Sequence, residues 1–458
     1  MASNNTFAHD GFPDKYDDKR EESADQLTIH EGEQKYRNLS WQKLTICLIV
    51  EAIALGSLSL PNAFAKVGMV AGVILSVGIG FIAIYTSYVV GQVKLKYPDV
   101  NHYADAVALI WGRFGYWLTT FMFVCLLTLI VGSHALTGTI AWIRIVEKPE
   151  VCALVWSVIS AVILFLLACP PTFHDFAFLG YIDFVSICIA IIITIIATGI
   201  EAHNGPGGLS GIAWSVWPPP GITFSDAFLA VTDIVFAYSF AVCQFSFMTE
   251  LHTPTDYVKS IWALGLIEIF IYTGTGGLVY AFVGPTVSSP ALLSAGTLIS
   301  RIVFGIALPV IFISGSINGT VTARYIMDRA FANSPTRYIN SVRSWIIWLV
   351  LLAIITIIGW VVAEAVPFFS DLLGIISALF ISGFSFYFPA LFWFLLIKEG
   401  KWNHGWKNIT LSILNAFCFV IGVAILVCGT YAAVTDIMSE YSGGEVRSPF
   451  TCASSGYT

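Results

Sequence analysis

Long apolar stretches separated by short polar segments fill almost the whole chain after residue 42. A transmembrane helix needs roughly 20 apolar residues to cross the hydrocarbon core of a bilayer. Eleven stretches of about that length fit the pattern: 43–65, 69–94, 114–144, 152–169, 176–200, 226–250, 260–283, 297–327, 343–364, 368–397 and 409–434. Proline and glycine residues, as at Pro170 and in 204–221, interrupt the chain between stretches. The pattern therefore predicts an all-α polytopic membrane protein with eleven transmembrane helices.

The positive charges indicate the orientation of these helices, because cytoplasmic loops keep an excess of lysine and arginine. With a cytosolic N-terminus, seventeen of the 22 Lys and Arg residues fall on the cytosolic side. The other five are Lys66, Arg144, Lys148, Arg301 and Arg447. The chain then divides into a disordered cytosolic tail (1–42), a transmembrane domain (43–434) and a short extracytosolic tail (435–458).

The composition supports a membrane protein, since 57% of the residues are hydrophobic and only 11% are charged. In a soluble domain about a quarter of all residues are charged, and these residues cover its surface. The net charge of −7 arises partly in residues 1–42, which hold nine acidic and five basic residues, and it gives no sign of nucleic-acid binding. The nine cysteines lack the spacing of a metal site, so we expect no metal and no cofactor.

The first stretch contains residues that weaken a helix in its middle. Gly56 lowers helix stability, Ser57 and Ser59 compete for backbone hydrogen bonds, and Pro61 lacks an amide donor. One reading is an unwound backbone that lines a cavity and binds a carboxylate with its free amides. The other reading is a proline-kinked helix filled by its neighbours, and the stretch alone leaves both open.

An inverted-repeat transporter has a second interrupted helix at the matching place in its second half. Five stretches later, residues 226–250 contain Ala237, Tyr238 and Ser239, which are small or polar enough to unwind. No glycine or proline occurs there, so this signal is weaker than the one at Gly56.

Three motifs then resemble a known family. The run 56–68 (GSLSLPNAFAKVG) resembles the first-helix motif of the amino acid/auxin permease family, which includes proton-coupled amino acid transporters. Residues 247–254 (FMTELHTP) are similar to that family's Met-x-Glu-x-x-x-Pro exit from the sixth helix, and 318–326 (NGTVTARYI) resemble its eighth helix. The resemblance covers residues 40–435, with fungal neutral amino acid permeases the most similar members.

The resemblance implies the leucine-transporter fold, a 5+5 inverted repeat with broken helices 1 and 6 and one extra helix at the end. It also implies a substrate cradle at the two breaks. The amides of Gly56, Ser57 and Leu58 would bind the substrate carboxylate. The ammonium group of the substrate would be bound by backbone carbonyl groups, namely those of Ala54, Phe236, Ala237, Tyr238 and Ser239. Tyr238 would also shape the side-chain pocket.

Several charged or polar residues inside the stretches could couple an ion to transport, because each needs a partner, water or a proton in the bilayer. Glu51 precedes Gly56 by about one and a half helical turns, so we favour it as a proton-coupling carboxyl group. Its alternative role is to tie two helices together. Asn318 and Thr320 could bind sodium or serve only in helix packing. For Asp183 and Glu268 a structural role is the better reading, whereas Asp233 could line the entry path.

The predicted function is symport of a neutral amino acid, with a proton, by a monomeric secondary transporter of the plasma membrane. Sodium coupling and a vacuolar location remain alternatives. Three other classes fit less well. A channel should show a filter-like loop or a charged ring, and an enzyme should show clustered catalytic groups. A receptor more usually has seven spans.

Cys152 and Cys452 fall on the same side of the membrane, either bridged or as free thiols.

Overall fold

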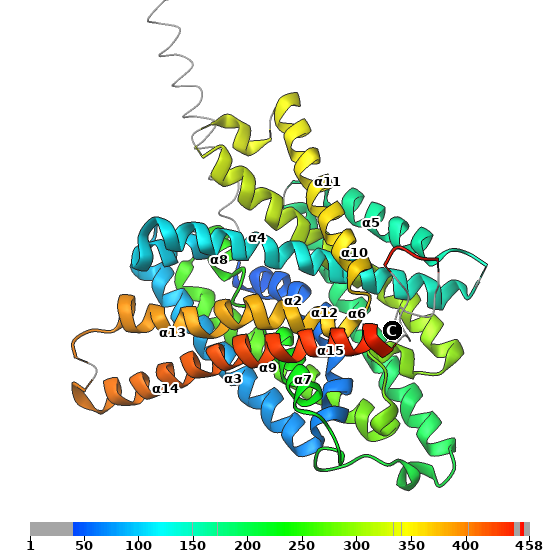
Figure 1. Cartoon of the computed structure of the whole chain (residues 1–458). Coiled ribbons are helices and arrows are strands. Elements are labelled where there is room, and N and C mark those ends of the chain that lie inside the picture. The colour runs from blue at the N-terminus through cyan, green and yellow to red at the C-terminus, as the bar shows by residue number, and fades with distance from the viewer. Residues whose placement is uncertain are drawn as a thin grey trace, which may run out of the picture.

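The computed structural model describes residues 40–148, 150–171, 173–332, 334–339, 341–401, 403–443 and 449–452. Residues 1–39, almost all of the predicted N-terminal tail, lie outside the described residues. The described part forms helices and connecting loops without strands (Figure 1). Its α-helices are α2 (Trp41–Val67), α3 (Met69–Lys96), α4 (Tyr103–Val146), α5 (Ala153–Ala168), α6 (Phe173–Asn204), α7 (Phe224–Ala237), α8 (Gln244–Glu250), α9 (Tyr257–Val283), α10 (Thr297–Ala330), α11 (Val342–Ala365), α12 (Phe369–Ile376), α13 (Phe388–Phe392), α14 (Gly405–Ala424) and α15 (Thr430–Gly443).

Short helical segments continue or connect these helices. Four π-helical segments extend α12, α13 and α14, namely η6 (Ser377–Ile381), η7 (Gly383–Tyr387), η8 (Trp393–Ile397) and η9 (Ile425–Gly429). The 3-10 helices lie in connections, namely η1 (Gly208–Gly211), η2 (Pro254–Asp256), η3 (Gly284–Thr286), η4 (Ala291–Ser294) and η5 (Pro335–Tyr338). Figure 1 shows that the segments from α12 to α13 and from α14 to α15 form two long antiparallel rods, which contact each other.

Each of the eleven predicted stretches contains helix. Among the described residues, eight helical segments are long and apolar enough to cross a membrane by length and composition. The other three stretches correspond to α2, to the shorter apolar helix α5 and to the divided pair α7–α8. An all-helical polytopic membrane protein is therefore confirmed, whereas a count of eleven crossings and an inverted repeat stay predictions.

The outer surface of the bundle is apolar, as lipid contact requires. Large apolar side chains stand out on it, such as Phe270, 81% exposed, and Phe114, 72% exposed. Small residues instead bring helices together inside. A β-carbon added to Gly132 of α4 would lie 2.5 Å from the backbone oxygen of Gly359 in α11. These two backbones therefore touch directly.

The expected break in the first stretch is absent. α2 runs as one α-helix from Trp41 to Val67, with Pro61 inside it. The serines do not unwind the helix, because the Ser57 hydroxyl donates to the Ile53 carbonyl at 2.8 Å and the Ser59 hydroxyl donates to the Gly56 carbonyl at 3.1 Å. α2 is also buried among α6, α7, α9 and α10. Of the two readings of this stretch, the structure shows the helix packed by its neighbours.

Candidate functional site

The predicted interruption of the sixth stretch is present. α7 ends at Ala237, α8 begins at Gln244, and residues 238–243 between them form turns. The turn backbone is held by a bond from the Val242 amide to the Ser239 carbonyl at 3.1 Å. At the start of α8, the Gln244 side-chain amide donates to the Ser87 carbonyl of α3 at 2.8 Å. The α8 arm of the divided helix is thus anchored to α3.

The end of α7 touches α2 at the glycine that the sequence singled out. A β-carbon added to Gly56 would lie 2.7 Å from the Ala237 α-carbon and 2.9 Å from its β-carbon. Ser57, Leu58, Phe236 and Ala237 are all buried around this contact, which we call the α2–α7 crossing. The structure thus brings together the two segments predicted to form the cradle, and no side chain fits between them at Gly56.

Tyr238, the first residue of the turn, points toward α3 and α9. Its hydroxyl lies 3.1 Å from the Ser76 hydroxyl, which lies 3.0 Å from the Thr273 hydroxyl. The ring of Tyr238 packs edge-on against Tyr272, with 5.1 Å between the ring centroids. Ser239 is only half-buried. Tyr238 therefore fixes the turn to its neighbours in this conformation.

Tyr272 extends the same contacts to the first helix. Its hydroxyl donates to the Ala52 carbonyl of α2 at 2.9 Å. Glu268 on α9 is buried and lies within electrostatic reach of Tyr238 and Tyr272. Glu268 was predicted from the sequence to have a structural role, whereas Tyr272 and Ser76 were not among the predicted site residues. A polar hydroxyl inside an apolar stretch was the only available signal for these two residues.

The predicted coupling residues lie in different surroundings. Glu51 and Ala54 lie on α2, and their side chains are outside what the structure describes. Asn318 on α10 is buried. Its side-chain amide donates to the Ser314 carbonyl at 3.0 Å, and its Oδ1 has no hydrogen-bond partner within the part of the chain that the structure describes. The Thr320 hydroxyl donates instead to the Ala168 carbonyl at the end of α5, at 3.2 Å. The structure therefore does not bring Asn318 and Thr320 to a common site.

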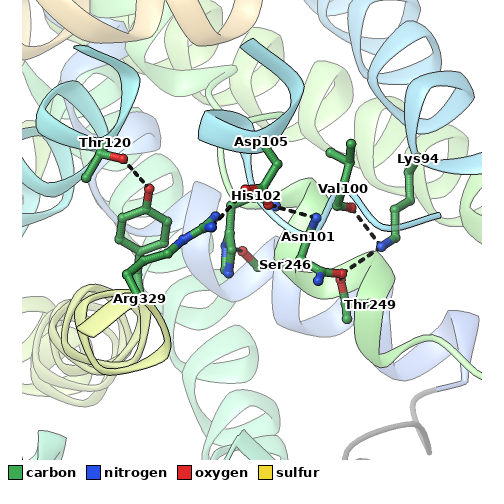
Figure 2. Close-up of polar contacts among 10 residues, drawn as sticks. Lys94, Val100, Asn101, His102, Asp105, Thr120, Ser246, Thr249 and Arg329 are labelled. Carbon is green, nitrogen blue, oxygen red and sulfur yellow. Dashed lines mark hydrogen bonds and ion pairs between the residues drawn. The ribbon is translucent and has the colours of Figure 1, made fainter. Parts of the chain in front are cut away.

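A polar cluster at one end of the bundle holds α8 in place (Figure 2). The Lys94 ammonium group of α3 donates to the Val100 carbonyl at 2.7 Å and to Asn101 Oδ1 at 2.9 Å. The Thr249 hydroxyl of α8 donates to the same Asn101 oxygen at 3.3 Å, and Ser246 lies 3.0 Å from His102 Nδ1. Loop 97–102 therefore joins the end of α3 to α8.

The same cluster connects α4 to α10. Asp105 Oδ2 accepts the His102 amide at 3.0 Å, and Asp105 Oδ1 pairs with Arg329 Nη1 at 2.8 Å. The Arg329 guanidinium group also lies over the Tyr116 and Tyr325 rings, 5.2 and 5.3 Å from their centroids. We call these groups the α8 anchor, after the arm that they hold. In the sequence, Lys94 and Arg329 count among the seventeen cytosolic positive charges and give no sign of this cluster.

His102 is uncharged in these surroundings. Desolvation of the ring, together with the nearby positive charge of Arg329, lowers the pKa of His102 to about 3. A neutral ring keeps one nitrogen that can accept a hydrogen bond, so Ser246 can donate to it.

Cys152 and Cys452 form a disulfide across a sequence separation of 300 residues. The Ala153 amide also donates to the Cys452 carbonyl at 3.2 Å, and Phe450 packs against Trp360 with 5.7 Å between ring centroids. The question left open by the sequence is thus answered in favour of the bridge. It fixes residues 449–452 to the start of α5 and to α11.

These features define a class: a polytopic helical membrane protein in which one divided helix packs against a buried glycine of another helix. The chain belongs to the family described as transmembrane amino acid transporter protein, whose model matches residues 37–435. The resemblance found in the three sequence motifs is therefore confirmed.

Individual relatives agree with this family. The chain is 60% identical to the N amino acid transport system protein of Neurospora crassa over 424 residues, which cover 92% of this chain and 90% of that protein. It is 22% identical to amino acid permease 1 of Arabidopsis thaliana, over 96% of this chain and 98% of the relative. Since these relatives are named as transporters or permeases, the prediction that the protein is not an enzyme is confirmed.

Among solved structures, the chain resembles Mhp1, a nucleobase-cation-symport-1 family transporter solved in a closed conformation with bromovinylhydantoin bound. The match has 13% sequence identity and a TM-score of 0.48, and it covers 89% of this chain and 93% of Mhp1.

Proposed function

We propose that the protein is a secondary active transporter that carries neutral amino acids together with protons by alternating access. The main support is its membership of the amino acid transporter family together with the 60% identity to a protein named for amino acid transport. The divided helix at residues 238–243 supplies the mechanical element that alternating access needs.

The substrate would bind where α2 and α7 cross. In the present conformation Gly56 and Ala237 are in contact, so binding requires these two segments to separate. The turn at 238–243 allows α7 to move relative to α8, because no continuous helix joins them. Once separated, the carbonyl groups of Phe236–Ser239 and the backbone of Ala54–Leu58 would face a small zwitterion, as the family resemblance implies.

We further propose that the N-terminus is cytosolic and that the protein works as a monomer in the plasma membrane. Disulfides persist in oxidising compartments, which supports an extracytosolic position for Cys152 and Cys452. The α8 anchor then lies at the cytosolic end, where Lys94 and Arg329 satisfy the positive-inside rule. A vacuolar membrane is the alternative location.

For the coupling ion, the proposal assigns the proton to Glu51, which lies on α2 before the crossing. Sodium is the second candidate because the buried Asn318 Oδ1 and Ser314 Oγ of α10 both lack a hydrogen-bond partner among the residues that the structure describes. These oxygen atoms occupy positions one helical turn apart on a helix that contacts α2. Oxygen atoms of this kind are suitable ligands for a hard cation.

Uptake by purified protein in proteoliposomes tests the proposal. Labelled leucine or phenylalanine should accumulate when the outside is acidic, and unlabelled neutral amino acids should compete. Replacing sodium by choline should not change this uptake. Accumulation that follows a sodium gradient and ignores pH would support the second candidate, and ion conductance without any uptake would overturn the transporter proposal.

A further inference from the structure

Three helices meet closely at the end of the bundle opposite the α8 anchor. A β-carbon added to Gly374 of α12 would lie 2.3 Å from Leu229 Cδ1 on α7. One added to Gly429, in η9 just before α15, would lie 2.7 Å from Thr232 Cγ2 on the same helix. The close packing of α7, α12 and the segment η9–α15 leaves no space for intervening side chains beside Thr232.

Carboxyl groups from all three helices come together next to this contact. Asp233 follows Thr232 on α7, Asp371 precedes Gly374 by about one turn of α12, and Asp436 lies on α15. The Asp371 and Asp436 carboxyl groups lie within hydrogen-bond reach of each other, and Asp233 lies within electrostatic reach of both. We call these three residues the carboxyl cluster.

Two of these carboxyl groups are almost completely removed from water and incompletely satisfied. Asp233 is 1% exposed and Asp371 is 5% exposed. The Oδ1 atoms of both residues are buried without a hydrogen-bond partner among the described residues. The Ser370 hydroxyl lies beside the Asp233 carboxyl group but donates to the Ser289 hydroxyl at 2.8 Å. Buried carboxylates without such partners are costly, so the cluster needs a bound positive species.

The neighbouring charges do not supply that species. Lys66 at the end of α2 is the cation that faces Asp233 and Asp371, and it already pairs with Asp226 at 3.5 Å. Glu440 on α15 adds further negative charge beside Asp371. Among the described residues, no group of three or more His, Cys, Asp and Glu side chains is arranged to hold a metal ion. Two carboxyl groups in hydrogen-bond contact instead share a proton.

We propose that the carboxyl cluster is a proton-binding site of the transporter, in which a proton shared by Asp371 and Asp436, next to Asp233, holds α7 against α12 and α15. This inference rests on the proposed proton coupling and adds a second carboxyl site to Glu51. Binding converts one carboxylate to a carboxylic acid and release restores it, so no other reactant is needed. Loss of the proton leaves adjacent negative charges, which repel α7 from its two neighbours.

Proton release at the cluster reaches the proposed substrate site through α7. Asp233 lies four residues before Ala237, the residue that touches Gly56. A shift of α7 away from α12 and α15 therefore moves the α2–α7 crossing. This connection gives the proton a mechanical effect on the position where the amino acid would bind.

Asp371→Asn tests the inference in proteoliposomes that contain the full chain. The amide imitates the protonated acid in shape and charge, so acid-stimulated uptake should fall to the level seen without a pH gradient. Exchange of external for internal amino acid should continue, because it needs no net proton movement. The matched control is Asp183→Asn, which alters a buried carboxyl group of α6 outside the cluster and should leave acid stimulation unchanged.

The outcomes separate this inference from the proposed function. A wild-type protein that ignores the pH gradient contradicts proton coupling itself. If uptake by the wild type responds to the pH gradient, and Asp371→Asn both exchanges amino acid and responds to the gradient as strongly as the wild type, the proposed site is overturned. If Asp371→Asn fails to fold, infrared titration of Asp233→Asn and Asp436→Asn against the wild type decides the matter. The band of a protonated carboxylic acid should be weakened in Asp436→Asn, and unchanged bands in both variants would refute the site.

Discussion

At the residue scale, the α2–α7 crossing depends on the absence of a side chain at position 56. The Ala237 α-carbon is backbone, so it cannot rotate away from a β-carbon that would lie 2.7 Å from it. Tyr272 reinforces the contact by donating to the Ala52 carbonyl one turn earlier on α2. Separating the two helices at this point therefore also requires the Tyr272 bond to break or α9 to follow.

Glu51→Gln tests the coupling role of the carboxyl group that precedes this crossing. If Glu51 carries the proton, the neutral amide should abolish accumulation driven by an acidic exterior, while amino acid exchange continues. Uptake and exchange of labelled phenylalanine in proteoliposomes measure both properties. Concentrative uptake equal to that of the wild type would remove Glu51 from the coupling mechanism.

The residues at the crossing were predictable, but their conformation was not. The glycine at 56 and the small residue at 237 were visible in the sequence, and they do meet. The helix at Gly56 persists because Ser57 and Ser59 bond to carbonyl groups of their own helix. The Tyr238–Ser76 contact joins residues 162 positions apart, and no local pattern specifies such a partner.

At the element scale, the two arms of the divided helix have different attachments. α7 packs against α12 and α15 and ends at the crossing, whereas α8 is tied to loop 97–102 through Ser246 and Thr249. In the proposed function, α7 moves relative to the anchored α8 arm, and this movement opens the crossing on one side of the membrane at a time. The Asp105–Arg329 pair adds the connection from the anchor to α10.

Arg329→Gln tests the importance of this anchor. The Arg329 and Asp105 side chains are 25% and 21% exposed, so the variant leaves a mostly buried carboxylate without its partner. The loss of stability should exceed the cost of about 0–1 kcal/mol that is typical of exposed pairs. It should not exceed the roughly 3–5 kcal/mol seen when one partner of a buried pair is removed. Thermal unfolding of the detergent-purified protein measures the change.

Lys259→Gln is the control, because it breaks an ion pair of the same 2.8 Å length, to Asp256, with a lysine side chain that is 61% exposed. Its melting temperature should match that of the wild type. Equal effects of the two substitutions would show that the Asp105–Arg329 pair contributes no more than an exposed pair.

Element positions followed closely from hydropathy, and the deviations have identifiable causes. The stretch predicted at 114–144 is the longer helix α4, Tyr103–Val146, with a kink at Gly112, where φ is 58°. Asp105 lies in the first part of α4, outside the predicted stretch, and its partner Arg329 belongs to α10, a pairing that no local pattern specifies. α15 also continues to Gly443, into the predicted C-terminal tail.

At the scale of the whole molecule, the two ends of the bundle differ in chemistry. One end holds the α8 anchor with Lys94 and Arg329, and the other holds the carboxyl cluster and the Cys152–Cys452 disulfide. This asymmetry fits a cytosolic first end and an oxidising exterior at the second. The sequence could place both cysteines on one side, but bridging depends on how residues 449–452 pack against α5 and α11.

Thiol labelling of intact cells tests this orientation. A membrane-impermeant maleimide should label Cys452 in the Cys152→Ser variant without any reductant, because the bridge is lost and the thiol faces outward. The same site in the wild type should label only after external reduction, and Cys152→Ser with Cys452→Ser should show no such signal. Labelling that appears only after permeabilisation would place the C-terminal end in the cytosol.

The most direct test of the account is equilibrium binding of a labelled neutral amino acid to purified Gly56→Val protein. Wild-type protein should bind leucine or phenylalanine. The valine side chain should occupy the space that the substrate carboxylate needs beside residue 56 once α2 and α7 separate, and it should lower the affinity about tenfold or more, the equivalent of about 1.4 kcal/mol. Gly78→Val, at a position on α3 where a β-carbon would meet nothing within 4 Å, should bind as the wild type does. Wild-type affinity in a folded Gly56→Val protein would show that the substrate binds away from the α2–α7 crossing.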